Sequence, residues 1–104
     1  MEPIPFMSPA QFVEAIRDRS KFHHMVLFTD HAEDKMEERD ITRRMVLKAL
    51  SRCDSLEDPT WRVDLSNWEG KVVGTSAGAR IAIVCAIRGD DLVVTVVTTH
   101  PAGR

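Results

Sequence analysis

The sequence predicts a single α+β domain, residues 1–104, in which N-terminal helices pack on one face of a four-stranded antiparallel sheet. Residues 8–52 have apolar side chains at helical spacing, whereas residues 60–99 contain alternating and fully apolar runs of strand length. Helices followed by strands, without regular alternation of the two, are typical of α+β folds. A chain of 104 residues, 43% hydrophobic and 29% charged, has the size and composition of one globular domain.

The first helix is predicted to begin at Ser8, after an extended lead-in of residues 1–7 that contains two prolines. Ser8 can act as the N-cap, Pro9 suits the first helical position, and Gln11 completes a capping box. We expect this helix to end near Ser20. Its apolar stripe consists of Phe12, Val13 and Ile16.

Two further helices are predicted. The second begins after Asp30, which can serve as its N-cap, and continues to Arg39. After a break, Thr42 caps the third helix, whose buried face consists of Met45, Val46, Ala49 and Leu50. The flanking segments are less regular. Residues 24–28 form a short apolar run, either a strand or a buried linker, and residues 51–60 are expected to be a loop.

The four strands are expected at residues 61–65, 71–73, 80–87 and 92–98. The first alternates apolar with polar side chains, which is typical of a half-buried strand. The third is apolar on both faces, as expected of a central strand. Turns are expected either at residues 66–67 or at residues 69–70, and again at residues 88–91.

Composition excludes several functional classes. A net charge of −2 and a pI near 6.0 disfavour a strongly basic nucleic-acid binder, although a local basic patch is compatible with both. No apolar run is long enough to cross a bilayer, and the first residues lack a secretory signal, so we expect a cytoplasmic protein. Cys53 and Cys85 lie outside any CxxC pattern, and neither a metal nor a small-molecule cofactor is expected.

The second predicted helix carries the side chains best suited to chemistry. At about 100° per residue, one flank of its buried face is lined by His31, Lys35 and Arg39. A histidine can exchange a proton near neutral pH, and neighbouring cations can hold a phosphate. The same pattern suits a solvated helix edge in which acidic neighbours pair with Lys35 and Arg39. His100 follows the last predicted strand, and we expect it in a C-terminal tail.

The third predicted helix carries a basic stripe. Its members recur every four residues, with one further arginine beside them: Arg43, Arg44, Lys48 and Arg52. Such a surface can bind the phosphates of RNA. A solvated helix face, balanced by acidic residues elsewhere, explains the stripe equally well.

Residues 31–42 resemble the H-A-x-x-[RK]-M-x-x-R-x-I-[ST] signature of a bacterial family of small uncharacterised domains. That family is similar in design to the RelE/ParE and BrnT toxins, in which helices pack against a curved antiparallel sheet and some members are ribonucleases. The resemblance extends roughly from Phe28 to Thr98 and implies a RelE/ParE-like fold. The site residues that it implies are His31, Lys35, Arg39, Arg80 and Thr98.

Two functions fit these observations. The first is a toxin-like RNA-cleaving or RNA-binding domain of a bacterial or phage mobile element. Its metal-independent reaction would transfer a phosphodiester to the adjacent 2′-hydroxyl, with His31 as acid or base and with Lys35 and Arg39 stabilising the pentavalent phosphate. Arg80 completes this predicted catalytic set.

The second function is that of a catalytically silent inhibitor or regulator, of the mobile-element or phage counter-defence type. It would bind a basic protein through an acidic helix face formed by Glu33, Asp34, Glu37 and Glu38. The expected partners are therefore RNA or a cognate protein, which would be an antitoxin or a basic host protein.

Overall fold

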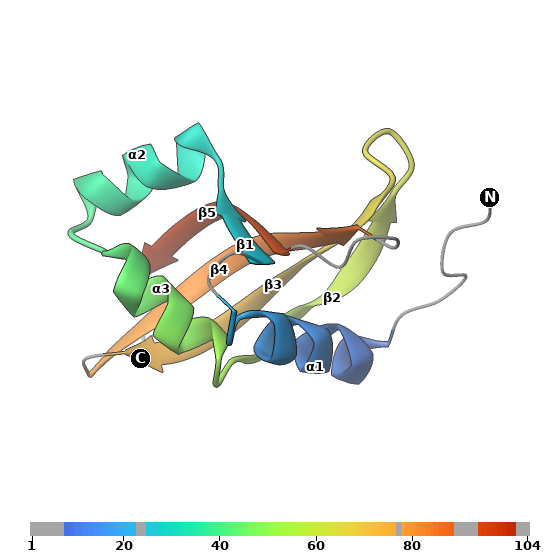
Figure 1. Ribbon diagram of the computed structural model, residues 1–104, viewed down its shortest axis with the longest axis horizontal. Coiled ribbons are helices and arrows are strands. Elements are labelled where there is room, and N and C mark those ends of the chain that lie inside the picture. The colour runs from blue at the N-terminus through green and yellow to red at the C-terminus, as the bar shows by residue number, and fades with distance from the viewer. Residues whose placement is uncertain (1–7, 23–24, 77, 89–93, 102–104) are drawn as a thin grey trace.

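The computed structural model describes residues 8–22, 25–76, 78–88 and 94–101, in which three helices pack against a five-stranded mixed sheet (Figure 1). The helices are α1 (Pro9–Arg19), α2 (Asp30–Glu38) and α3 (Arg43–Leu50). The strands are β1 (Val26–Phe28), β2 (Asp54–Arg62), β3 (Asn67–Ser76), β4 (Ala79–Arg88) and β5 (Val94–Pro101). The predicted α+β class is confirmed. The predicted lead-in and most of the turn predicted at residues 88–91 lie outside the described residues.

The sheet has the strand order β1-β5-β4-β3-β2. Strands β2 to β5 form the antiparallel meander that the sequence predicts, with β4 inside the sheet. The prediction of four strands is wrong by one strand, because β1 pairs in parallel with β5. Val26 is buried and Phe28 is half-buried, while the backbone of β1 bonds to the edge of β5. Residues 26–28 of the apolar run are therefore a strand and not a linker.

The course of β2 differs from the prediction. The strand begins at Asp54, inside the segment expected to be a loop, and it ends at Arg62. Val63 and Leu65 lie in the turn that follows, with exposed fractions of 79% and 50%. Ser66 closes this turn with a φ of 52°. The start of β2 shows no alternating apolar pattern in the sequence, because β2 is an edge strand with an irregular register and mostly exposed side chains.

The helix caps follow the sequence with one exception. Ser8 caps α1 and Thr42 caps α3, as predicted. The cap of α2 is Thr29 and not Asp30, because the Thr29 hydroxyl accepts a hydrogen bond from the Ala32 N–H at 3.0 Å. The Thr29 hydroxyl also donates to a carbonyl of β5 at 3.1 Å, so this cap ties the start of α2 to the sheet.

The core lies between the helices and one face of the sheet. The predicted buried stripes of α1 and α3 are confirmed, apart from Met45, which is half-buried. They meet the strand residues Trp68, Val72, Ile81, Ile83, Cys85, Ile87, Val94 and Val96. None of the helices in the described residues combines the length and the apolar character needed to span a membrane.

The other face of the sheet carries no helix among the described residues. Val73, Ala82 and Ala86 point to this side, and they are buried without belonging to the core cluster. We call this surface the open face. It consists of the alternate residues of β2 to β5 that point away from the helices.

Candidate functional site

The open face gathers polar side chains into neighbouring rows. The strand register places one row through His100, Ala82, Val73 and Asp54. The next row runs through Thr98, Val84, Lys71 and Glu57. Ala82, at the centre of this surface, is 1% exposed, so the groups around it cover it.

His100 is the histidine that the structure places among charged groups. It lies in β5, paired with Ala82, and not in the predicted tail. Burial lowers the pKa of His100, and the positive charges of Lys71 and Arg39 lower it further, while Glu57 acts in the opposite direction. The imidazole is therefore neutral near pH 7 and is able to accept a proton.

Arg39 ends α2 beside His100. One guanidinium nitrogen, Nη1, donates a hydrogen bond of 2.7 Å to the carbonyl oxygen of Thr99. This bond covers the edge of β5 beyond its short pairing with β1. Arg39 keeps other N–H donors, because a guanidinium carries five.

The predicted trio on α2 does not form one cluster. His31 is exposed at the start of the helix and makes no hydrogen bond or ion pair within the described part of the chain. Eight residues of helix separate it from Arg39, a rise of about 12 Å. The Lys35 ammonium lies 3.7 Å from a Glu38 carboxylate oxygen, which agrees with the solvated helix edge that the sequence also allows.

Two of the four carboxylates on the acidic face of α2 have a positively charged neighbour within the protein. Glu33 forms an ion pair with Arg43, and Glu38 faces Lys35. The guanidinium of Arg43 also lies 5.0 Å above the centre of the Phe28 ring. Arg43 therefore connects α3 to α2 and β1. Its guanidinium is engaged in these contacts, whereas the sequence predicts that it binds phosphate.

A basic pocket of about 410 Å³ lies where the end of α3 meets the end of β3 and the start of β4. Its lining consists of Lys48, Arg52, Asp54, Val73, Gly74, Thr75, Ser76, Gly78 and Arg80. The sequence predicts RNA binding by Lys48 and Arg52 and catalysis by Arg80, and the structure brings all three to one pocket. Arg44, the remaining member of the basic stripe, does not line it.

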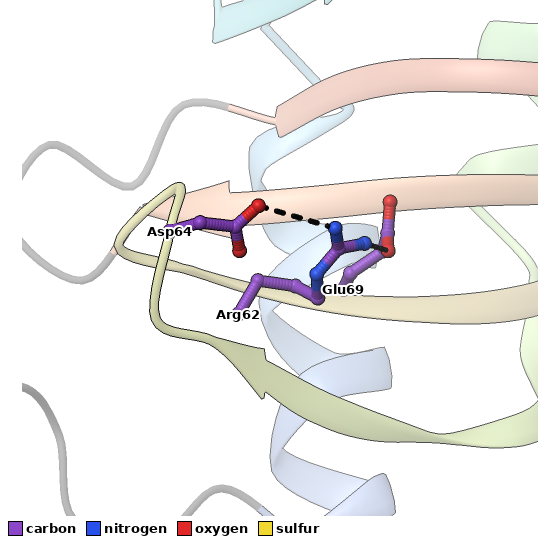
Figure 2. A network of polar contacts seen from close by, with 3 residues as sticks. All are labelled: Arg62, Asp64 and Glu69. Carbon is purple, nitrogen blue, oxygen red and sulfur yellow. Dashed lines mark hydrogen bonds and ion pairs between the residues drawn. The ribbon is translucent and has the colours of Figure 1, made fainter.

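The opposite end of the open face is closed by an ion-pair network. Figure 2 shows the Arg62 guanidinium between the carboxylates of Asp64 and Glu69. Its nitrogens lie 2.7 Å from Glu69 and 3.4 Å from Asp64. The hydrogen bond to Glu69 is the main cause that raises the pKa of Arg62. This end of the face therefore holds its own countercharges.

The two cysteines are poor candidates for nucleophiles. Cys53 and Cys85 are both buried with free thiols. Burial is the main cause that raises the pKa of Cys53 to about 11, and burial also raises the pKa of Cys85. Both side chains are therefore protonated thiols at neutral pH.

Residues 28–99 match a family model described as a domain of unknown function (DUF4258). The chain belongs to this family. The DUF4258 match begins at the end of β1 and includes α2, α3, Lys71 and the cations of the basic pocket, whereas α1 and His100 lie outside it. Comparison with curated proteins and with solved structures gave no match.

Proposed function

We propose that this DUF4258 domain binds RNA on its open face and cleaves it without a metal, by transfer of a phosphodiester to the adjacent 2′-hydroxyl. The observation that carries the proposal is that His100 lies close enough to two cations, Arg39 and Lys71, for their charges to act on it, on a sheet surface free of helices in the described residues. A neutral imidazole beside cations combines a proton acceptor with binding groups for a phosphate. Residues 31–42 resemble the signature of a family that is similar in design to the RelE/ParE and BrnT toxins, some of which are ribonucleases, and this resemblance supports an RNA-cleaving function.

The reaction needs one proton acceptor and stabilisation of negative charge. His100 takes the proton of the 2′-hydroxyl as its oxygen bonds to phosphorus. The bond from phosphorus to the 5′ oxygen breaks, and that oxygen takes a proton from water. The products are a 2′,3′-cyclic phosphate and a 5′-hydroxyl. Arg39 and Lys71 stabilise the charge that develops on the phosphate oxygens.

The contacts of the two cations are compatible with this role. Lys71 lies 3.6 Å from a Glu57 carboxylate oxygen, and Glu57 is exposed. Such a long and exposed ion pair is weak, so a phosphate can compete for the ammonium group. Arg39 is held at Thr99 through one nitrogen and can present its remaining donors to the ligand.

The test compares the two histidines. The protein is incubated with a mixed-sequence RNA in the presence of a chelator, and the ends of the products are analysed. We expect His100→Ala to slow cleavage by about 100-fold or more while RNA binding persists. His31→Ala serves as the matched control, because His31 is exposed on α2 and has no partner in the described residues. Loss of cleavage in His31→Ala alone would return the acid–base role to His31 and refute the role of His100.

The alternative, a silent inhibitor that binds a basic protein, has support in two carboxylates of α2. Asp34 and Glu37 are exposed and form no ion pair within the described residues. Binding through this face predicts that Asp34→Lys with Glu37→Lys abolishes a complex with a basic partner and leaves RNA binding intact. Failure of the wild-type protein to bind RNA even at low salt would favour this alternative.

A further inference from the structure

Three cations line the basic pocket: Lys48, Arg52 and Arg80. Lys48 lies in the last turn of α3, Arg52 lies two residues beyond the end of that helix, and Arg80 lines the same pocket from β4. Within the described residues, neither Lys48 nor Arg52 forms an ion pair. The carboxylate in the lining, Asp54, is bound to Arg17 at 2.9 Å. Like charges at this spacing repel each other, so an anion between them is favoured.

The pocket also presents backbone groups at an open strand edge. The pairing of β2 with β3 begins at Asp54 and Val73, whereas β3 continues to Ser76. Within the described residues, the stretch from Gly74 to Ser76 therefore has β4 on one side and no strand on the other. Gly74, Thr75 and Ser76 all line the pocket, and a strand edge without a partner offers backbone N–H groups as donors. Phosphate oxygens accept hydrogen bonds from such groups.

The cations are fixed relative to this edge by tight packing. A Cβ atom on Gly74 would overlap the carbonyl oxygen of Ala49, so the absence of a side chain lets α3 lie directly on β3. Ala49 is fully buried and directly follows Lys48 in the helix. The pocket is thus built between rigid elements, a helix end and the paired strands β3 and β4.

We infer that the basic pocket binds the phosphomonoester group of a nucleotide, and in particular the phosphorylated end of an RNA strand. A phosphomonoester carries about −1.5 to −2 charges at pH 7, whereas a phosphodiester inside a strand carries one. Lys48 and Arg52, two cations that form no ion pair within the described residues, therefore favour the end of the strand over its interior. The pocket volume of about 410 Å³ lies in the size range of small-molecule sites, so it has room for more than the phosphate alone.

The pocket joins the open face. Val73 lines the pocket and also lies in the same row of the sheet as His100, two strands away. Strands are spaced by about 4.8 Å, which puts these two positions roughly 10 Å apart. One RNA strand can therefore place its phosphorylated end in the pocket and a phosphodiester at His100. This assignment of the RNA end rests on the proposed function, whereas binding of a free nucleotide does not.

The experiment titrates the protein with one short RNA in three forms: with a 5′-phosphate, with a 3′-phosphate and with neither. The RNA carries 2′-O-methyl groups, which prevent cleavage through the 2′ oxygen, and adenosine 5′-monophosphate is titrated separately. We expect at least one phosphorylated form to bind the wild-type protein about tenfold or more tightly than the unphosphorylated form.

Three variants locate the effect. Lys48→Gln and Arg52→Gln each reduce the preference for the phosphorylated end to less than about threefold, since each loses a charge-assisted contact. Arg44→Gln, on the same helix but outside the pocket, lowers the affinity for all three RNAs by a similar factor and keeps the preference. Because Arg44, Lys48 and Arg52 are exposed, these variants are expected to fold, which thermal melting checks.

The outcomes separate the two proposals. Equal binding of all three RNAs overturns the pocket assignment and leaves RNA binding by the open face in place. If no RNA binds but the monophosphate binds and Arg52→Gln abolishes that binding, the pocket is a nucleotide site and the proposed RNA function fails. If neither RNA nor the monophosphate binds, the pocket assignment is overturned as well.

Discussion

At the end of the sheet where β2 turns into β3, Arg62 lies between the carboxylates of Asp64 and Glu69 (Figures 1 and 2). At the opposite end, Lys48 and Arg52 line a pocket and form no ion pair within the described residues. Both ends are rich in charge and belong to strands of the same sheet. The first satisfies its charges internally, as a structural network does. The second keeps its cations available, as a binding site for an anion requires.

The two ends also differ in what holds them. The turn end is tied by exposed ion pairs and by the edge-to-face contact of Trp61 with Trp68, whose ring centres are 5.6 Å apart. The pocket end is held by backbone packing of α3 on Gly74. Exposed ion pairs contribute little to stability, while overlap of backbone atoms in a packed core is costly. This difference sets the order of the effects expected below.

The largest effect is expected at Gly74. Gly74→Ala places a methyl group against the Ala49 carbonyl, so α3 must move away from β3. We expect a loss of roughly 3 kcal/mol in the free energy of unfolding, measured by urea denaturation. Gly78→Ala is the control at the same pocket, where nothing obstructs a Cβ atom and the cost comes from a φ of 79°. That variant should lose about 1 kcal/mol. Equal losses in both variants would show that the α3–β3 contact is not what holds the pocket end.

A smaller effect separates the charges of the two ends. Arg62→Gln leaves Asp64 and Glu69 without their common partner, so the free energy of unfolding should fall measurably, though by less than in Gly74→Ala. Arg52→Gln should leave stability unchanged or raise it slightly, because it removes a like-charge neighbour of Lys48. Both variants are measured by urea denaturation at low salt. A loss in Arg52→Gln as large as that in Arg62→Gln would mean that Arg52 already makes a stabilising contact in the pocket. The two ends of the sheet would then not differ in how their charges contribute to stability.

The smallest effect concerns pH. The pKa of His100 is lowered in the folded state by burial and by Lys71 and Arg39, against the opposing influence of Glu57. The unfolded chain therefore binds this proton more readily, at the ordinary histidine value of 6.5. Well above pH 6.5, His100 is neutral in both the folded and the unfolded chain, so its titration does not affect stability. As the pH falls through 6.5 toward the lower folded pKa, the unfolded chain takes up the proton first, and the free energy of unfolding decreases.

This pH effect is checked by melting the wild-type protein and His100→Gln at pH values of about 7.5 and 5.5. The wild-type melting temperature should drop more between these two conditions than that of the variant. An identical drop in both proteins would place His100 in an environment without net electrostatic effect, and would weaken the case for a neutral imidazole in the proposed site.

Local patterns were sufficient where one stretch of chain decides its own structure. The capping box at Ser8 and the cap at Thr42 each act within one helical turn, and the run at residues 80–87 is apolar on both faces because β4 is internal. Such signals are readable because donor, acceptor and periodicity lie within a few residues. The sequence by itself therefore determined the helices, the order of the antiparallel strands and the basic character of α3, but not the position of β2.

Contacts between distant segments decided the rest. The parallel pairing of β1 with β5 joins residues far apart in the chain, and no local pattern records it. His100 was assigned to a tail because the strand signal fades before it, and Lys71 was overlooked because it stands among apolar residues of β3. Only the strand register brings these two side chains to one surface, and only the packing of α3 on Gly74 brings Lys48 and Arg52 to the strand edge. The sequence specifies the chemical type of each side chain. Its neighbours across a sheet depend on the strand register, which is set by the fold as a whole.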